Sequence, residues 1–290
     1  MIDSVSIIRP SGYSHSEAFR EVANSFNAAL DLSPEVAIGE YPVTDHSLVF
    51  GAHLTTELPK DCVIYQTEQV CRPQDSAWMT AHYFRALKEH EVWDYSLKNI
   101  EALARHGIKA KHVPIGYMPC MTNKYADGFK VGCPDSDINA PDPRPIDILH
   151  YGSMTPRREA VLNELKRSGL NVFTLFGKYG EERDRLIARS KVVLNLHYYP
   201  ANIFEIFRCS HLFANKACVV SEYGADKVLE STYYNGAAFA EYDDLVHVCK
   251  SLVGNDTARR AIAAAGYKIF SRRTQRDILI DCGIIEKADA

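Results

Sequence analysis

Short motifs that identify common enzyme classes are missing from this sequence. It contains no G-x-x-x-x-G-K-[ST] phosphate loop, no G-x-S-x-G elbow and no H-E-x-x-H metal motif, and its eight cysteines form no C-x-x-C pair. No G-x-G-x-x-G follows the first apolar run either. These absences weaken kinase, hydrolase, metalloprotease and simple dehydrogenase interpretations.

Long apolar runs and an excess of basic charge are missing as well. No uncharged stretch is long enough to cross a membrane, and the N-terminus has no basic region followed by an apolar block. The formal net charge of -4 gives no surplus for nucleic acid or acidic lipid, which favours a small ligand. Cysteines such as Cys62 and Cys218 stand in apolar runs, as buried hydrophobes do. Together these features predict a soluble, cytoplasmic protein.

The sequence does have a regular alternation of strand-like and helix-like segments. Its 290 residues, 46% of them hydrophobic, are enough for two domains of typical size. In the first half, apolar runs predict strands and amphipathic spacing predicts helices. The predicted strands are 5–8, 35–38, 47–52, 62–66, 91–95 and 111–119, and the predicted helices follow Ser16 and cover 77–87 and 97–106.

The second half continues this alternation beyond a segment rich in Gly, Pro, Asp and Asn. Strict alternation implies parallel, doubly wound sheets that bind ligands at their carboxyl edges. We therefore expect an α/β protein with two Rossmann-like domains, residues 1–120 and 146–290, which face each other across a cleft and are joined by a linker at 121–145. The predicted strands of the second half are 147–151, 171–176, 192–197, 217–221 and 237–240, with helices at 158–168, 181–190, 203–215, 242–253 and 256–265.

A phosphate-binding site is predicted where the strand at 147–151 ends. The chain passes through Gly152 and Ser153 into a helix start that carries Arg157 and Arg158. Free backbone N–H groups and the positive end of the helix dipole attract anions there, whereas two arginines oppose the dipole unless an anion is bound. A solvated first helical turn is the alternative. The same geometry follows the strand at 192–197, and two such helix starts at one sheet edge suggest a diphosphate ligand.

Five segments of the second half follow one another in a distinctive order and spacing: Tyr151-Gly152-Ser153, Phe176 to Gly180, Ala188 to Asn195, Ile203 to Ile206 and Ala217 to Glu222. In this order and spacing they resemble the nucleotide-sugar domain of GT-B fold glycosyltransferases of the group 1 type, including the spore-maturation-protein-like branch. The resemblance implies transfer of a sugar from a nucleotide-diphosphate sugar, bound by residues 146–290, to a hydroxyl acceptor bound by residues 1–120. It also implies that a terminal helix crosses back onto the first domain.

Donor-binding residues are carried over from the matching segments. Glu205 matches the family glutamate that accepts hydrogen bonds from the ribose, although a carboxylate also suits a helix start without any ligand. Lys178 or Tyr179 would hold the base, unless this turn only joins a strand to a helix. The implied set is Gly152, Ser153, Arg157, Arg158, Lys178, Tyr179, Asn202, Ile203, Phe204 and Glu205.

Four residues are candidates for catalysis. His197 stands where retaining members have a second glutamate near the transferred sugar, so the sugar and the stereochemical outcome stay open. A structural role for a lone histidine at a strand end is equally consistent with the sequence. His15, His53 and Glu68 compete as the general base of an inverting reaction.

The predicted acceptor loop contains Gly12 and Tyr13, and no metal or cofactor is expected. Asp135 and Asp137 formally fit a D-x-D metal motif, but their Pro- and Gly-rich surroundings favour a turn with Asx hydrogen bonds. The expected partners are a nucleotide sugar and a hydroxyl-bearing acceptor, and the sequence leaves monomer and homodimer open.

Two other functions stay open. A nucleotide-sugar epimerase or hydrolase on the same scaffold would turn over the donor with no acceptor present. A non-catalytic protein would bind the nucleotide sugar without reacting.

Overall fold

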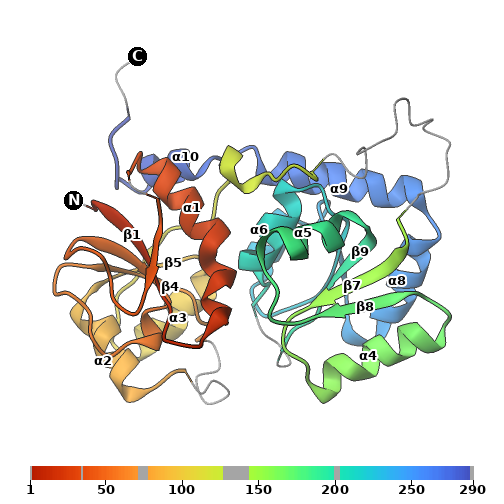
Figure 1. Ribbon diagram of the computed structural model, residues 1–290, viewed down its shortest axis with the longest axis horizontal. Helices are drawn as coiled ribbons and strands as arrows, with labels where there is room; N and C mark the ends of the chain where they lie inside the picture. Colours follow the sequence, from red (N-terminus) through yellow and green to blue (C-terminus); the bar gives the residue numbers. More distant parts are fainter. Residues whose placement is uncertain (1, 34, 71–77, 127–143, 199–202, 288–290) are drawn as a thin grey trace. The chain divides into compact units, whose positions relative to one another are not determined.

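The chain forms two compact units in a computed structural model that describes residues 2–33, 35–70, 78–126, 144–198 and 203–287 (Figure 1). Unit 1 comprises Met1–Met121 together with Arg273–Ala290, and unit 2 comprises Thr122–Arg272. Each unit is built around its own parallel sheet. Residues 127–143, most of the predicted linker, lie outside the described residues, as do Asp135 and Asp137.

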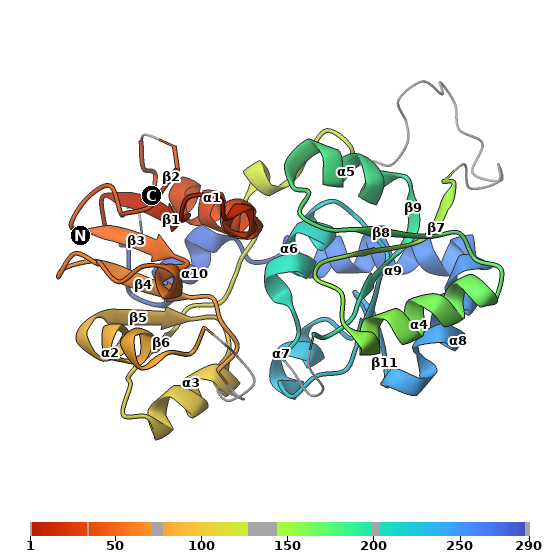
Figure 2. The ribbon, with the colours of Figure 1, turned by 60° about the horizontal axis from the view of Figure 1, so that its bottom comes forward.

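Unit 1 contains a six-stranded parallel sheet in the order β2-β1-β3-β4-β5-β6. Helices α1 and α10 pack together on one side of it, and α2 and α3 lie on the other (Figure 2). Aromatic side chains fill the core, where Phe26 contacts Phe50, Tyr65 and Trp93. The strands are β1 (Ser4–Ile8), β2 (Ala37–Gly39), β3 (Ser47–Phe50), β4 (Val63–Gln66), β5 (Glu91–Asp94) and β6 (Lys111–His112), and the helices are α1 (Arg20–Ala29), α2 (Ala81–Glu89), α3 (Leu97–Arg105) and α10 (Gln275–Asp281).

The C-terminal helix α10 belongs to unit 1. The backbone N–H of Gly116 donates to the Gln275 side chain at 2.7 Å, and a capping box of Thr274 and Asp277 begins the helix. A Cβ on Gly116 would lie 2.6 Å from Ile278 and 2.8 Å from the Gln275 backbone, so the close approach requires glycine.

Unit 2 contains a five-stranded parallel sheet in the order β11-β10-β9-β7-β8. Helices α4 and α8 contact each other on one face, and α6 and α9 contact each other on the opposite face (Figure 2). The strands are β7 (Ile146–Tyr151), β8 (Val172–Leu175), β9 (Ser190–Asn195), β10 (Val219–Glu222) and β11 (Ala238–Ala240), and the helices are α4 (Pro156–Arg167), α5 (Gly180–Ala188), α6 (Ile206–Ala214), α7 (Lys227–Thr232), α8 (Leu245–Val253) and α9 (Asp256–Phe270).

The predicted α/β class with parallel sheets is confirmed, but several predicted boundaries are wrong. The strand predicted at 111–119 ends at His112, because Pro114 has no N–H to give to a ladder. Helix α2 begins at Ala81 rather than 77, since the Thr80 side chain accepts from the Tyr83 N–H and caps it there. Helix α6 begins at Ile206 rather than 203, with Glu205 at its N-cap position.

Candidate functional site

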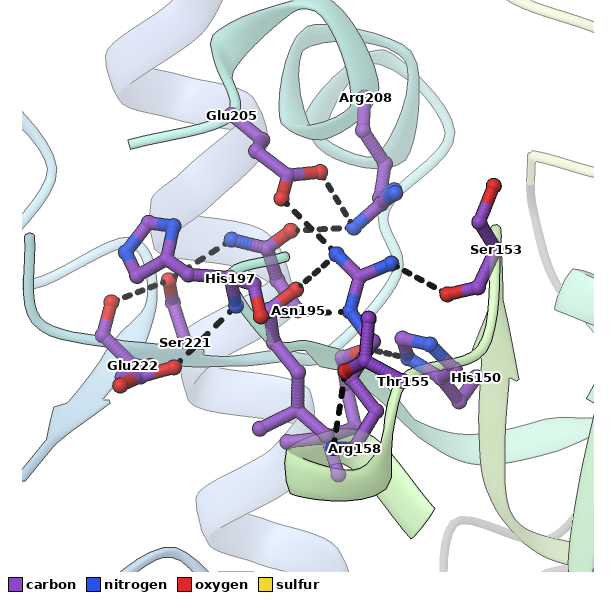
Figure 3. A network of polar contacts seen from close by, with 12 residues as sticks. His150, Ser153, Thr155, Arg158, Asn195, His197, Glu205, Arg208, Ser221 and Glu222 are labelled. Carbon is purple, nitrogen blue, oxygen red and sulfur yellow. Dashed lines mark hydrogen bonds and ion pairs between the residues drawn. The ribbon is translucent and has the colours of Figure 1, made fainter. Parts of the chain in front are cut away.

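The candidate site lies in unit 2, where β7 and β9 end beside the starts of α4 and α6 (Figure 3). Between β7 and α4, Gly152 has a φ of +130°, a conformation that side chains with a Cβ rarely adopt. Helix α4 then begins with Pro156 at its first turn and with Thr155 as its cap, whose hydroxyl accepts from the Arg158 N–H at 3.3 Å. The sequence thus brings Arg158 to the carboxyl edge of the sheet.

Arg158 ties the two strand ends together. Its guanidinium donates to the Ser153 carbonyl at 2.7 Å, to the carbonyls of Leu196 and His197, and to Glu205 Oε1 at 3.2 Å (Figure 3). The side chain is only 3% exposed, and burial lowers its pKa to about 10. A guanidinium is still a cation at neutral pH with that pKa, so the site holds a buried positive charge.

Glu205 joins Arg158 to a second arginine, Arg208 of α6. Arg208 Nη1 lies 2.6 Å from Glu205 Oε2 and donates to Asn195 Oδ1 at 2.7 Å. Burial would raise the pKa of Glu205, but Arg208 and Arg158 together lower it below its ordinary value, so the carboxylate is ionised. A Cβ on Gly152 would lie 3.0 Å from Arg208 Nη2 and 3.4 Å from Arg158 Nη1, so glycine leaves room for both guanidinium groups.

Arg157 is held by a different carboxylate. It donates through both terminal nitrogens to Glu222, at 2.6 Å for Nη1 to Oε2, and its guanidinium lies 4.1 Å from the centroid of the Tyr242 ring. Glu222 Oε2 also accepts from the His197 backbone N–H at 3.2 Å. Arg157 and Glu222 therefore link the end of β10 to the end of β9 by hydrogen bonds.

Two buried histidines have unsatisfied ring nitrogens. Neither Nδ1 nor Nε2 of His197 has a hydrogen-bond partner among the described residues, although the side chain is fully buried. His150 shares a hydrogen bond between Nδ1 and the Leu194 carbonyl at 3.0 Å, while its Nε2 has no partner within the described part of the chain. Burial lowers the pKa of both, that of His150 to about 3, so both rings are neutral near pH 7.

The other predicted donor-binding residues are placed differently. Lys178 is half exposed and pairs with Glu182 at 3.2 Å, and Tyr179 is the N-cap residue of α5. Phe204 is fully buried, with its ring 5.2 Å from Phe239 and 5.8 Å from Tyr233, so its side chain belongs to the core. Ile203 is also fully buried, and Asn202 lies outside the described residues.

Arg208 and Asn195 belong to this polar cluster, although the sequence analysis did not single them out. The available signal was the position of Arg208 three residues after Glu205, since residues at this spacing share one face of a helix. Asn195, the last residue of β9, had the signal of a polar residue at a carboxyl strand end.

The remaining predicted residues lie in unit 1. His53 Nε2 is 3.4 Å from Glu68 Oε1 at the ends of β3 and β4, and the ring of Tyr13 contacts that of His15 at 5.3 Å. Gly12 has a φ of +74° in the loop before them. In the described parts of both units, no group of three or more His, Cys, Asp or Glu could hold a metal ion, and no helix is long and apolar enough to span a membrane.

No protein-family model matches the sequence. The chain is 29% identical over 271 residues to the uncharacterized protein L140 of Acanthamoeba polyphaga mimivirus. The aligned region covers 86% of this chain and 82% of L140. Uncharacterized protein L138 of the same virus is 36% identical over 107 residues, or 36% of this chain and 12% of L138.

Two solved structures share the fold over almost the whole chain. Anabaena Alr3699/HepE in complex with UDP-glucose superposes with a TM-score of 0.65 at 10% identity, covering 98% of each chain. WaaG, a glycosyltransferase involved in lipopolysaccharide biosynthesis, superposes with a TM-score of 0.60 at 13% identity, covering 99% of this chain and 100% of its own. The fold of this chain is therefore that of GT-B glycosyltransferases.

Proposed function

We propose that this chain is a glycosyltransferase of the group 1 type that binds a nucleotide-diphosphate sugar at the carboxyl edge of the unit 2 sheet. In this proposal the sugar is transferred to a hydroxyl acceptor. The observation that carries the proposal is the Arg158–Glu205–Arg208 cluster, in which two guanidinium groups share one carboxylate beside Gly152.

The charge of the site suits a diphosphate. Arg157, Arg158 and Arg208 carry three positive charges against the two carboxylates of Glu205 and Glu222, while His150 and His197 are neutral. One net positive charge therefore remains, and the N-terminal end of α4 adds its dipole. A diphosphate would neutralise this excess, which supports an anionic ligand over a neutral one.

His197 offers what a sugar hydroxyl needs. A neutral imidazole has one N–H donor and one lone-pair acceptor, and a hydroxyl can satisfy either. Buried polar atoms without partners are costly, and neither ring nitrogen of His197 has a partner among the described residues, which supports a ligand group beside this ring.

The proposed chemistry places the arginines at the leaving group. As the bond between the sugar and the diphosphate breaks, negative charge grows on the diphosphate, and fixed guanidinium groups stabilise that charge without reorganising. The guanidinium of Arg158 donates hydrogen bonds to the carbonyls of Ser153, Leu196 and His197. Because these bonds hold it in place, its orientation does not depend on a bound ligand.

Calorimetric titration with UDP-glucose, UDP and UMP tests the proposal. UDP-glucose and UDP should bind, UMP should bind more weakly, and Arg158→Lys should weaken UDP binding by at least about tenfold, because lysine cannot reproduce the fork-shaped contacts. Arg185→Gln is the matched control, since Arg185 is exposed on α5 of the same unit.

Three outcomes distinguish the proposal from its alternatives. Failure of UDP, UDP-glucose and a panel of other nucleotide-diphosphate sugars to bind would remove it. UDP-glucose consumption with no acceptor would favour the epimerase or hydrolase. Tight donor binding with no turnover across an acceptor panel would favour the non-catalytic binding protein.

A further inference from the structure

A chain of hydrogen bonds runs from β10 through β9 to Arg208 of α6 (Figure 3). Arg208 Nη1 donates to Asn195 Oδ1 at 2.7 Å, and Asn195 Nδ2 donates to Ser221 Oγ at 3.0 Å. The Ser221 hydroxyl donates to the backbone carbonyl of Glu222 at 3.0 Å. Asn195 and Ser221 are fully buried, so bulk water does not compete for these bonds.

The direction of this chain follows from which groups can donate. A guanidinium can only donate, so the Asn195 side chain turns its oxygen toward Arg208 and its NH2 group toward Ser221. Ser221 accepts from Asn195 and gives its own proton to a carbonyl, which can only accept. Hydrogen bonds that share one direction strengthen one another. The ends of β9 and β10 therefore set where Arg208 Nη1 lies.

Arg208 has more hydrogen-bonding capacity left for a ligand than Arg158 has. A guanidinium carries five N–H groups. Arg158 uses four of them, one on Nε, one on Nη1 and two on Nη2, and only 3% of its side chain is exposed. Arg208 uses two, both on Nη1, for Asn195 and Glu205, and 15% of its side chain is exposed. Among the described residues, the N–H groups on Nε and Nη2 of Arg208 have no hydrogen-bond acceptor.

The remaining N–H groups of Arg208 lie on one edge of the guanidinium, which faces the loop before α4. A Cβ on Gly152 would lie 3.0 Å from Nη2, so this nitrogen is beside the loop backbone. The N-terminal end of α4 follows, where the helix dipole favours an anion. The edge formed by Nε and Nη2 can donate two parallel hydrogen bonds to a phosphate group.

We propose that Arg208 binds the donor diphosphate through its Nε–Nη2 edge, and that Asn195 and Ser221 are positioning residues that hold this edge toward the ligand. The proposal rests on the proposed function. Glu205 alone cannot fix Arg208, because it stands three residues earlier at the start of the same helix. Asn195 adds a second anchor on a different element, β9. In this arrangement Arg158 acts by holding Glu205 and the strand ends, where its hydrogen bonds already lie.

Calorimetric titration with UDP tests the contact and its support. Arg208→Met should weaken UDP binding by at least about tenfold, because it removes a charge-assisted, two-point contact. Asn195→Ala removes the anchor on β9 and should weaken UDP binding by at least about threefold. When Asn195→Ala is added to Arg208→Met, no further loss is expected, because a residue that acts only through Arg208 has nothing left to position.

Ser221 gives a milder test with a conservative rescue. Ser221→Ala leaves Asn195 Nδ2 without its acceptor, so the amide can turn this donor toward Arg208, and UDP binding should weaken by at least about threefold. Ser221→Thr keeps the hydroxyl and should keep the UDP affinity of the parent chain. Ser210→Ala is the matched control, since Ser210 is also buried but donates only to the Phe207 carbonyl of its own helix.

Urea unfolding of each variant shows that it is folded before its UDP affinity is compared. An unchanged UDP affinity in Arg208→Met or in Ser221→Ala would overturn the inference. So would a further loss when Asn195→Ala is added to Arg208→Met, since that loss would show a general structural role. If Asn195→Ala does not fold, Ser221→Ala takes its place in the double variant.

The proposed function fails in a different way. Failure of UDP and of other nucleoside diphosphates to bind the parent chain would overturn the proposed function, and this inference with it. Binding by the parent chain that does not respond to Arg208→Met or Ser221→Ala would overturn the inference alone.

Discussion

At the scale of single residues, the proposed donor site concentrates buried charges, and each of them is stable only because it has a partner of opposite charge. Glu205 is shared by Arg158 and Arg208, and Glu222 is held by Arg157. Removing one partner of such a pair leaves an uncompensated buried charge at a cost of about 3–5 kcal/mol. Variants at these positions therefore need a stability measurement beside every binding measurement.

Gly152→Ala tests how closely the two guanidinium groups approach the backbone. Alanine at Gly152 meets both a strained φ of +130° and Arg208 Nη2 at 3.0 Å, whereas Gly169 has a φ of +87° but nothing within 4 Å of its Cβ position. Gly169→Ala should therefore cost only about 1 kcal/mol for its backbone conformation. Gly152→Ala should cost more and should also weaken UDP binding, as urea unfolding and calorimetry would show. Equal costs and unchanged UDP affinity would contradict this packing.

His150 should make the protein less stable in acid. Its pKa is about 3 in the folded chain, below the ordinary value of 6.5, so the unfolded chain binds the proton more readily. The contribution of the neutral His150 ring to stability is complete above about pH 6.5 and is lost as the pH falls toward 3. The loss between pH 7 and pH 4.5 is about 2.5 kcal/mol. His53 and His197 act in the same direction.

His150→Asn removes this titration and keeps an amide N–H, at the position of Nδ1, that can donate to the Leu194 carbonyl. Urea unfolding at pH 7 and pH 4.5 should show a smaller loss of stability in the variant than in the parent chain. Identical losses in the two proteins would show that His150 does not contribute.

At the scale of elements, the sequence predicted which segments form the strands of the sheets. It did not predict where the residues of the connecting loops lie. Apolar runs mark each strand that is buried on both faces, such as β3 and β9. The start of α6 was predicted three residues too early. The apolar residues Ile203 and Phe204 fit the helical spacing of the residues after Ile206, although they precede the helix. Arg158 and Glu205 were predicted individually, but their contact joins α4 to α6 and follows only from the folded sheet.

Docking of α10 depends on Gly116. Alanine there would need space that Ile278 and the Gln275 backbone occupy, so Gly116→Ala should push α10 away and destabilise unit 1. Gly254→Ala is the control, since its nearest neighbours lie at an ordinary 3.7 Å and its φ is −79°. Limited proteolysis should cleave near residues 271–287 faster in Gly116→Ala than in the control. Equal cleavage rates would contradict this account of the contact.

At the scale of the whole molecule, the net charge of the chain does not reveal the positive charge of the site. The chain carries a formal net charge of -4, yet three arginines converge where β7 and β9 end. The net charge therefore favoured a small ligand over nucleic acid but gave no sign of this local excess of positive charge. The α/β class followed from alternation along the sequence, whereas the charge balance of the site required residues from β9, α4, α6 and the end of β10 to be brought together.

A crystal structure of this protein grown with UDP-glucose would locate the bound donor. We expect the diphosphate at the N-terminal end of α4, with its oxygens within hydrogen-bonding distance of Arg158 or Arg208 and a sugar hydroxyl against His197. A diphosphate bound away from Arg158, Glu205 and Arg208 would contradict this expectation.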